Sequence, residues 1–462
     1  MSIFGMAQES ADLGYENEAP MANGEETHTV ANEIAEVQNL QFEAADEDTA
    51  ADKLENEAEQ TEEVAEVLED DVAQERALDP TAAKLLKLTF QNIVGKQYAG
   101  RTLPATESFD GSRSEARENT RIALEGIKET LKKFWEAIKA QFKKVYEKVK
   151  SWIVKTFSAA KKLKDRAEKI QKKANDTVGT IEEKSFSFGQ TKTIAVDGKH
   201  NEAGTLLSSF HEVRSAIEAT LSTLKKDQID DAVEGVIKKI ESGFIANGNK
   251  RDVDFSALAR AYAEVAKAAG AGNTVPASVG DTKKYIEQFG DANEISVEAH
   301  VGLPGGKAIV SVKPKTITGN NDLETITKHI KAFRISLSND KYTPRDVSEG
   351  DVKTLTTSQI DKVCDDVIEI AESVYTYEKA WANRDRYVDK IVKDTDQLVK
   401  DFDAESDVKD RDQRHFQGFI NAQVASVRRK INFEANLCSY ALTTSNAFLN
   451  YAERSLAQHK AK

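Results

Sequence analysis

Side chains that could carry out catalysis or bind a metal are scattered in this 462-residue sequence. Zinc sites on helices use paired motifs such as HxxxH or HExxH, because that spacing places two imidazoles on one face. No such pair occurs, and no GxSxG motif marks a nucleophilic serine. The sequence therefore predicts that the protein is not an enzyme and needs no metal or cofactor. The seven histidines are His28, His200, His211, His300, His329, His415 and His459.

Two other features invite a chemical interpretation and favour a structural one. Cys364 and Cys438 lie in helical patterns with no Cys or His at ligand spacing, so we expect two buried thiols and neither a disulfide nor a zinc site. The segment Leu303-Pro-Gly-Gly-Lys307 lacks the GxxxxGK[ST] spacing of a phosphate-binding loop. Alternating sequences flank it, which predicts the turn of a β-hairpin.

A strongly basic segment is the clearest candidate for binding. Residues 121–176 contain 17 basic and 7 acidic side chains. From Ile127 to Trp152 apolar residues recur every three or four positions, which predicts a long amphipathic helix; the pattern resumes more weakly as far as Ile170, after an expected break near Ser158. The lysines that could contact DNA phosphates are Lys132, Lys133, Lys139, Lys143, Lys144, Lys148 and Lys150.

Three interpretations fit this basic helix. It could be an ordinary bundle helix with a solvated lysine face. It could contact nucleic acid without reading its sequence, because lysines neutralise phosphates but the arginine-rich pattern of base recognition is missing. It could lie in a membrane interface, since Phe134, Trp135, Phe142, Trp152 and Phe157 oppose the lysines. We expect Trp135 and Trp152 to be buried in the protein, which would argue against the membrane.

The charge of the chain reverses ahead of this helix. Residues 1–107 contain 25 acidic and 6 basic side chains, a net charge of −19, although the whole chain carries only −14. The rest of the chain therefore sums to +5. The acidic leader has few large apolar residues, so we expect it to be disordered or marginally helical; its apolar residues from Ile34 to Leu68 could form a helix only with a packing partner.

The elements place the chain in the mainly α class, with long amphipathic helices in a bundle-like body. Alternation at Ile295, Val310 and Ile335 predicts a small antiparallel sheet of two or three strands. Helices are expected on both sides of this insertion. The helices are expected at residues 202–226, 228–244, 255–270, 358–402 and 411–459. The expected organisation is an acidic leader (1–107), a basic helical segment (108–180), a helical region with the sheet (181–345) and a C-terminal helical hairpin (346–462).

The junction between leader and body contains Leu103-Pro-Ala-Thr-Glu-Ser-Phe109, followed by Ile122-Ala-Leu-Glu-Gly-Ile127 and then by a run of aromatic residues and lysines. Through these segments, residues 1–175 resemble the internal head proteins of large tailed bacteriophages. In that family a prohead protease removes an acidic leader after a small residue, any residue and Glu. Ala105, Thr106 and Glu107 match this motif, so Ser108 would begin the trimmed protein.

The resemblance implies a virion structural protein that is packaged inside the phage head and trimmed during capsid maturation. Its partners would be the prohead protease, capsid or scaffold core proteins, and packaged double-stranded DNA. It would reside in the host cytoplasm during assembly. The alternative function is a cytoplasmic helical scaffold or peripheral membrane protein with a disordered acidic tail. No apolar run is long enough to span a bilayer.

Overall fold

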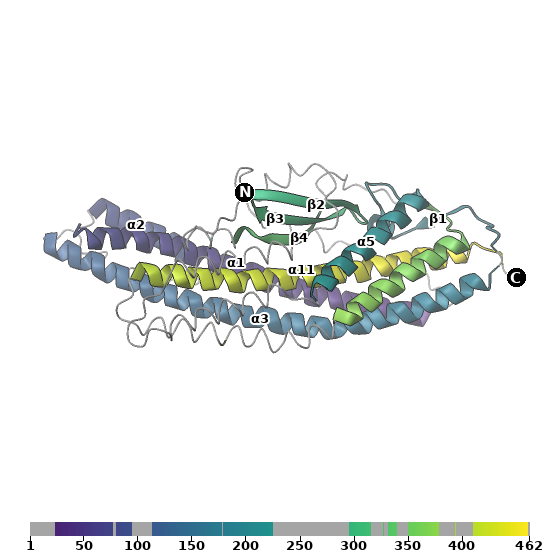
Figure 1. The fold of residues 1–462 in the computed structure, drawn as a ribbon, viewed down its shortest axis with the longest axis horizontal. Coiled ribbons are helices and arrows are strands. Elements are labelled where there is room, and N and C mark those ends of the chain that lie inside the picture. The colour runs from purple at the N-terminus through teal and green to yellow at the C-terminus, as the bar shows by residue number, and fades with distance from the viewer. Residues whose placement is uncertain are drawn as a thin grey trace.

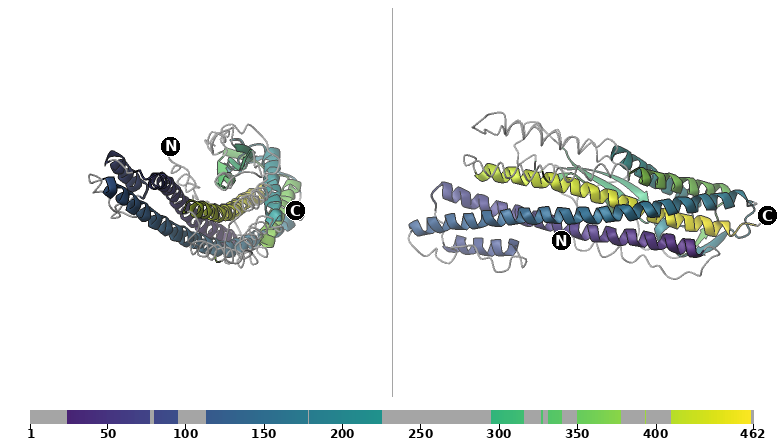
Figure 2. Two further views of the ribbon diagram at one scale, coloured as in Figure 1. Left: turned by 60° about the vertical axis from the view of Figure 1, so that its left-hand side comes forward. Right: turned by 90° about the horizontal axis from the view of Figure 1, so that it is seen from below.

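Three long helices form the body of the protein. The structure is a computed structural model; α1 (Gly24–Ala73), α3 (Arg113–Asn175) and α11 (Asp410–Leu456) run side by side along the long axis (Figures 1 and 2). The shorter α2 (Pro80–Val94) packs against α1. The residues that the structure describes are 24–76, 80–94, 113–177, 179–224, 295–315, 331–339, 350–377 and 410–460, with Thr327 and Lys393.

The side-chain contacts define the directions of these helices. As residue numbers rise along α1, the residue numbers of its partners on α3 decrease. Lys162 lies opposite Glu33 and Lys128 lies opposite Glu69, so the two helices are antiparallel. Trp152 contacts Ser439 and Arg166 contacts Glu453. Both pairs are separated by 287 residues in the sequence, so α3 and α11 run parallel. α1 therefore packs antiparallel to both of the other helices.

α3 is continuous, and the expected break near Ser158 is wrong. The helix contains 63 residues, which corresponds to roughly 94 Å at 1.5 Å per residue. Its buried stripe continues past the expected break, through Phe157, Ala159, Ala160 and Leu163. The weaker apolar pattern there consists of alanines that face the core, and alanine has the highest helix propensity.

Within the acidic leader, residues 24–73 form the helix α1, and its packing partners are α3 and α11. One row of its buried positions, which we call the seam, repeats every seven residues, the spacing of a coiled coil. Apart from two valines the seam is alanine, so the backbones can approach closely along it, and Ile34, Val64 and Leu68 are buried beside it. The buried residues of this repeat are Val30, Val37, Ala44, Ala51, Ala58 and Ala65.

The remaining helices largely follow the expected pattern. α5 (Ala203–Leu224) confirms the helix expected at 202–226, and α11 confirms the one expected at 411–459. A helix at 357–377 confirms the start of the element expected at 358–402. A short helix, α4 (Thr191–Ile194), was not expected. The helices expected at 228–244 and 255–270, and the loop 403–410 apart from Asp410, lie outside the described residues.

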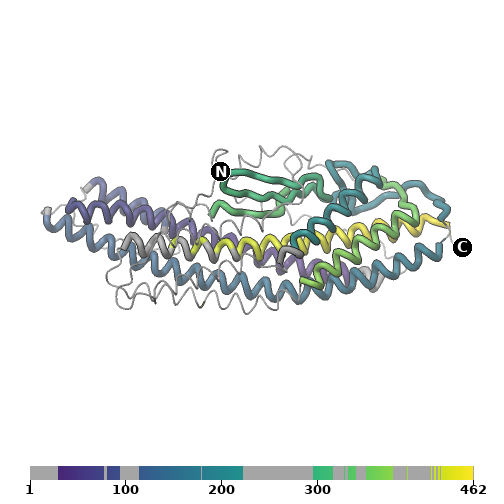
Figure 3. Tube along the Cα trace, viewed as in Figure 1, coloured from purple at the N-terminus to yellow at the C-terminus, as the bar shows by residue number. Residues whose placement is uncertain are grey.

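The small antiparallel sheet is confirmed. It contains β2 (Ile295–Leu303), β3 (Lys307–Pro314) and β4 (Arg334–Asn339) in that order, with Val297 opposite Val312 and Val310 opposite Ser336. Figure 3 shows the sheet on one side of the helical layer, where β4 contacts α11. The hairpin turn is as expected, because Gly305 and Gly306 have φ angles of 71° and 62° that favour glycine.

A second, two-stranded sheet was not expected from the sequence. β1 (Ser185–Phe188) pairs antiparallel with β5 (Gly350–Lys353). Phe188 of β1 packs on Tyr451 of α11, with 5.6 Å between ring centroids, and the Tyr451 hydroxyl donates a hydrogen bond to the Lys353 carbonyl. β1 precedes the three-stranded sheet in the sequence and β5 follows it. Their pairing therefore brings both segments together at the end of α11.

The expected burial of the cysteines and tryptophans is confirmed. Cys364 and Cys438 are both free and fully buried, and burial raises the pKa of Cys364 to about 12. Trp152 is 1% exposed and its indole Nε1 donates a 2.9 Å hydrogen bond to Ser439 Oγ; Trp135 is 4% exposed. The aromatic face of α3 is therefore core.

Candidate functional site

The contact between the acidic helix and the basic helix is built around a ladder of ion pairs, which we call the lysine ladder. Lys148 Nζ lies 2.5 Å from Glu43 Oε2 and Lys155 Nζ lies 2.7 Å from Glu36 Oε2, while Lys162 pairs with Glu33. The three lysines are seven residues apart, so they face α1 from the same side of α3. The hydrogen bonds that Lys148 and Lys155 donate to Glu43 and Glu36 raise the pKa values of both lysines.

The ladder continues through neutral and weaker contacts. Gln141, seven residues before Lys148, donates a 2.9 Å hydrogen bond to the Glu47 carbonyl and also contacts its carboxylate. Near the other end of α1, Lys128 Nζ lies 3.8 Å from Glu69 Oε1. Carboxylates of α1 thus meet α3 from Glu33 to Glu69, and the pairing fixes the register of the two helices.

The face of α1 toward α11 is also polar. Gln38 donates a 3.0 Å hydrogen bond to Thr443 Oγ1, and Gln41 donates a 2.7 Å hydrogen bond to Asn436 Oδ1. Thr443 and Asn436 are seven residues apart, and one further step of seven along α11 reaches Arg429. α1 is therefore joined to α11 by hydrogen bonds and charge.

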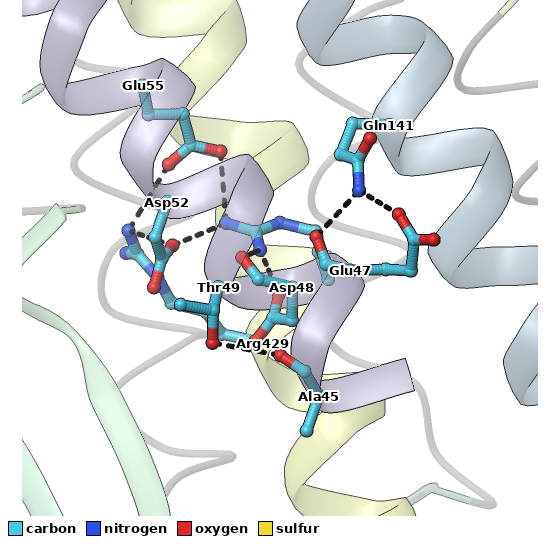
Figure 4. A network of polar contacts seen from close by, with 9 residues as sticks. Ala45, Glu47, Asp48, Thr49, Asp52, Glu55, Gln141 and Arg429 are labelled. Carbon is cyan, nitrogen blue, oxygen red and sulfur yellow. Dashed lines mark hydrogen bonds and ion pairs between the residues drawn. The ribbon is translucent and has the colours of Figure 1, made fainter. Parts of the chain in front are cut away.

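Arg428 and Arg429 form the centre of this second contact, which we call the arginine cluster. The Arg428 side chain is only 1% exposed, and its Nη2 lies 2.5 Å from Asp52 Oδ1 and 3.1 Å from Glu55 Oε1. Its Nη1 donates to the Asp48 carbonyl at 2.7 Å and pairs with the Asp48 carboxylate. Figure 4 shows Asp48, Asp52 and Glu55 along α1, with Arg429 beside them.

Burial and charge act in opposite directions on these groups. Burial raises the pKa values of Asp48 and Glu55, although Arg428 lowers them in part. Partial burial also opposes ionisation of Asp52, but Arg428 and Arg429 outweigh it and its pKa is lowered. The pKa of Arg428 is raised because its three carboxylate partners overcome the effect of burial. The ionised cluster thus depends on every partner being present.

Two further cations flank the cluster. Lys331 Nζ lies 3.0 Å from Glu59 Oε1 of α1. Arg334, at the start of β4, reaches the surface, but the surrounding protein removes part of its hydration and Arg429 is close, so its pKa is lowered. Four cations of the body therefore surround four carboxylates of one helix face, at positions 48, 52, 55 and 59.

The lysines that sequence predicts as DNA contacts fall into different environments. Lys148 belongs to the lysine ladder. Lys133 pairs with Glu129 along its own helix, and Lys139 pairs with Glu136 at 2.7 Å and lies 5.3 Å from the Trp135 ring centroid. The exposed residues of the set are Lys132, Lys143, Lys144 and Lys150.

The predicted cleavage residues Ala105, Thr106, Glu107 and Ser108 lie outside the described residues. The same motif occurs several times among the described residues, and two of these copies differ clearly in accessibility. Residues 73–75 (Ala-Gln-Glu) are exposed in the turn after α1, where Glu75 has a φ of 49° and pairs with Arg117 at 3.1 Å. Residues 123–125 (Ala-Leu-Glu) lie within α3, with the first two side chains buried.

The structure also bears on the membrane alternative. The five aromatic residues that would enter lipid are buried within the protein, each with at most 8% of its surface exposed. Among the residues that the structure describes, no helix has an apolar stretch long enough to cross a membrane. Within the same residues, no group of three or more His, Cys, Asp or Glu side chains is arranged to hold a metal ion.

Sequence reasoning missed the lysine ladder and the arginine cluster. The sequence does contain the signal, as a strict seven-residue repeat of small apolar residues in the leader and of lysines in the basic helix. Searching for large apolar residues overlooks a seam made of alanine.

Comparison with known proteins extends the resemblance over nearly the whole chain. A family model described as phiKZ-like phage internal head proteins matches residues 33–454. The comparisons with curated proteins and with solved structures gave no match. The matched family is one of structural head proteins and is not a known enzyme family. The location that the family implies favours a virion protein over a cytoplasmic scaffold. The chain therefore belongs to the phiKZ-like phage internal head proteins, which are structural components of the virion.

Proposed function

We propose that this internal head protein is made as a precursor in which the acidic helix α1 covers a DNA-contacting surface until the leader is removed. The observation that carries the proposal is the lysine ladder. Lys148, Lys155 and Lys162 each pair with a carboxylate of α1, so those lysines are engaged in the uncut chain. Removing the leader would free them for phosphates.

Trimming is proposed to occur after Glu107, with Ser108 as the new first residue. The exposed turn at 73–75 is the second candidate, because proteases cut exposed turns more readily than packed helices. The copy at 123–125 is a poor candidate because it lies inside α3. The prohead protease is the proposed enzyme, and capsid or scaffold core proteins are the proposed assembly partners in the host cytoplasm.

Cutting and unmasking are separate events in this proposal. α1 keeps its buried seam, the lysine ladder and the arginine cluster after a cut anywhere beyond residue 73. The cut leader therefore stays bound until another polyanion competes for the same cations. Packaged DNA is the proposed competitor, since it carries one negative charge per about 1.7 Å of helix axis.

Mass measurement and N-terminal sequencing of the protein from purified particles test the trimming. A polypeptide that begins at Ser108 is the expected result, and one that begins at Arg76 would select the second site. Abundant peptides from residues 20–100 in mature particles would contradict removal of the leader.

DNA binding is tested separately by comparing the full chain with the particle-derived protein. The trimmed form should bind duplexes of unrelated sequence equally, with an affinity that falls steeply with salt, and the full chain should bind more weakly. If the trimmed form does not bind at about 50 mM salt, where phosphate contacts are strong, the DNA role fails.

A further inference from the structure

We infer that the arginine cluster of α11 is a second phosphate-binding site, distinct from the α3 lysines, which α1 holds closed in the full chain. This inference rests on the proposed DNA contact and adds a location for it. The site consists of Arg428 and Arg429 with the flanking Lys331 and Arg334. Its ligand is the phosphodiester backbone of duplex DNA.

The chemistry of Arg428 supports an anion site. A guanidinium offers a rigid fork of donors that matches carboxylate and phosphate oxygens equally well. Arg428 is almost fully buried and its two Nη atoms contact Asp48, Asp52 and Glu55. The carboxylates of α1 thus occupy positions where phosphate oxygens could bind the same donors.

The charge balance indicates a polyanion as the alternative occupant. In the full chain the four cations face Asp48, Asp52, Glu55 and Glu59, and the region is neutral. Without α1 the four cations would repel one another, and Arg429 already acts on Arg334 in this way. A densely charged chain relieves that repulsion better than separate ions, because it supplies several anions from one molecule.

The position of the cluster makes it part of one continuous surface. α1 contacts α3 on one side through the lysine ladder and α11 on the other through the arginine cluster. When α1 departs, both sets of cations border the same vacated groove. A backbone that enters the groove therefore meets lysines from α3 and arginines from α11.

Full-chain variants test the inference without any cleavage. Asp48→Asn, Asp52→Asn and Glu55→Gln together remove the carboxylates that hold the cluster. A matched control removes two Asp and one Glu from the exposed side of the same helix, through Asp46→Asn, Asp70→Asn and Glu63→Gln. Both variants gain the same net charge, so a difference between them reports the cluster itself.

Binding to a 25-base-pair duplex is measured by fluorescence anisotropy over a range of salt concentrations. The first variant should bind more tightly than the control, with a log-log salt slope steeper by about 1.8, which is 0.9 for each of two phosphates. Adding Arg428→Gln and Arg429→Gln should return the slope to that of the control. Equal binding by both triple variants would overturn the inference. A salt slope that stays the same after the arginine replacements would also overturn it.

Hydrogen exchange supplies a second measurement in case the first variant does not fold. In the unaltered full chain at low salt, duplex DNA should slow exchange around Arg428 and speed it in residues 45–58. If DNA is bound but amide exchange in α11 does not change, the proposed site is refuted. If the first variant binds a synthetic peptide of residues 24–73 but no duplex, the cluster is a receptor for acidic helices and the phosphate site is wrong. Absence of trimming in particles would leave these results unchanged.

Discussion

Replacement of Arg428 by methionine tests whether the arginine cluster holds α1 on the body. Methionine keeps much of the volume of the side chain but removes its charge. Arg428 is 1% exposed, and its partners Asp48 and Glu55 are 19% and 15% exposed. The change therefore leaves carboxylates in a buried site with Arg429 as their nearest cation.

Removal of one partner from a buried ion pair costs about 3 to 5 kcal/mol. Because the loss falls on the contact of α1 with α11, hydrogen exchange of α1 amides is the direct assay. Exchange by local opening should accelerate by about two to three and a half orders of magnitude, at 1.36 kcal/mol per factor of ten. A control replacement of Asp46, which is exposed on α1, should leave exchange unchanged within error.

The pH dependence gives this prediction its sign. Burial acts to raise the pKa values of Asp48, Asp52 and Glu55, and the charge of Arg428 is the main influence that lowers them. In Arg428→Met that charge is removed, so all three folded-state pKa values should exceed those of the unfolded chain. Groups of that kind destabilise the fold as pH rises through their pKa values. The deficit should therefore be largest at neutral pH and shrink as the solution is acidified toward pH 4. A deficit independent of pH, or exchange unchanged in α1, would show that the cluster does not hold the helix.

Three further results are expected. Trp135→Ala and Trp152→Ala should each lower the free energy of unfolding by about 3 to 5 kcal/mol, as measured by urea denaturation, because both indoles are buried. A full chain nicked at a protease site inserted between α2 and α3 should retain residues 24–73 during gel filtration at low salt and lose them at 1 M salt, where the Debye length is only 3 Å; loss at low salt would contradict the two-step release. Conversion of four lysines to Gln should flatten the salt slope of DNA binding by the trimmed protein while the helical content is kept, and an unchanged slope would remove α3 from the interface. Those lysines are Lys139, Lys143, Lys144 and Lys150.

Periodicity allowed much of the body to be predicted from sequence. α3, α5 and α11 carry large apolar residues at helical spacing, and β2 to β4 alternate clearly, so local patterns suffice. The pair β1 and β5 escaped prediction because each strand has four residues and its partner lies more than 150 residues away. Register between distant short strands depends on tertiary packing, which no local pattern reports.

The position of α1 was beyond a pattern search for a different reason. Its buried seam is mostly alanine, and its contacts with α11 pair Gln41 with Asn436 and three acids with Arg428. Each of these residues in isolation is typical of a solvated surface. Only the complementary residues on α3 and α11 show that the surface is an interface, and those residues lie about 100 and 380 positions further along the chain.

The composition of this interface suits a helix that is held firmly but can be exchanged. Burial of one alanine methyl contributes far less than burial of a large side chain, for which about 1.5 to 3 kcal/mol is typical. α3 fills the core with Phe134, Trp152 and Phe157, whereas the buried face of α1 combines four alanines with aliphatic residues such as Ile34 and Leu68. Charged contacts therefore contribute a substantial part of its attachment, and charged contacts yield to salt and to competing polyanions. A leader held by large apolar side chains alone would resist both, so the alanine positions and the charged flanks together favour displacement by DNA.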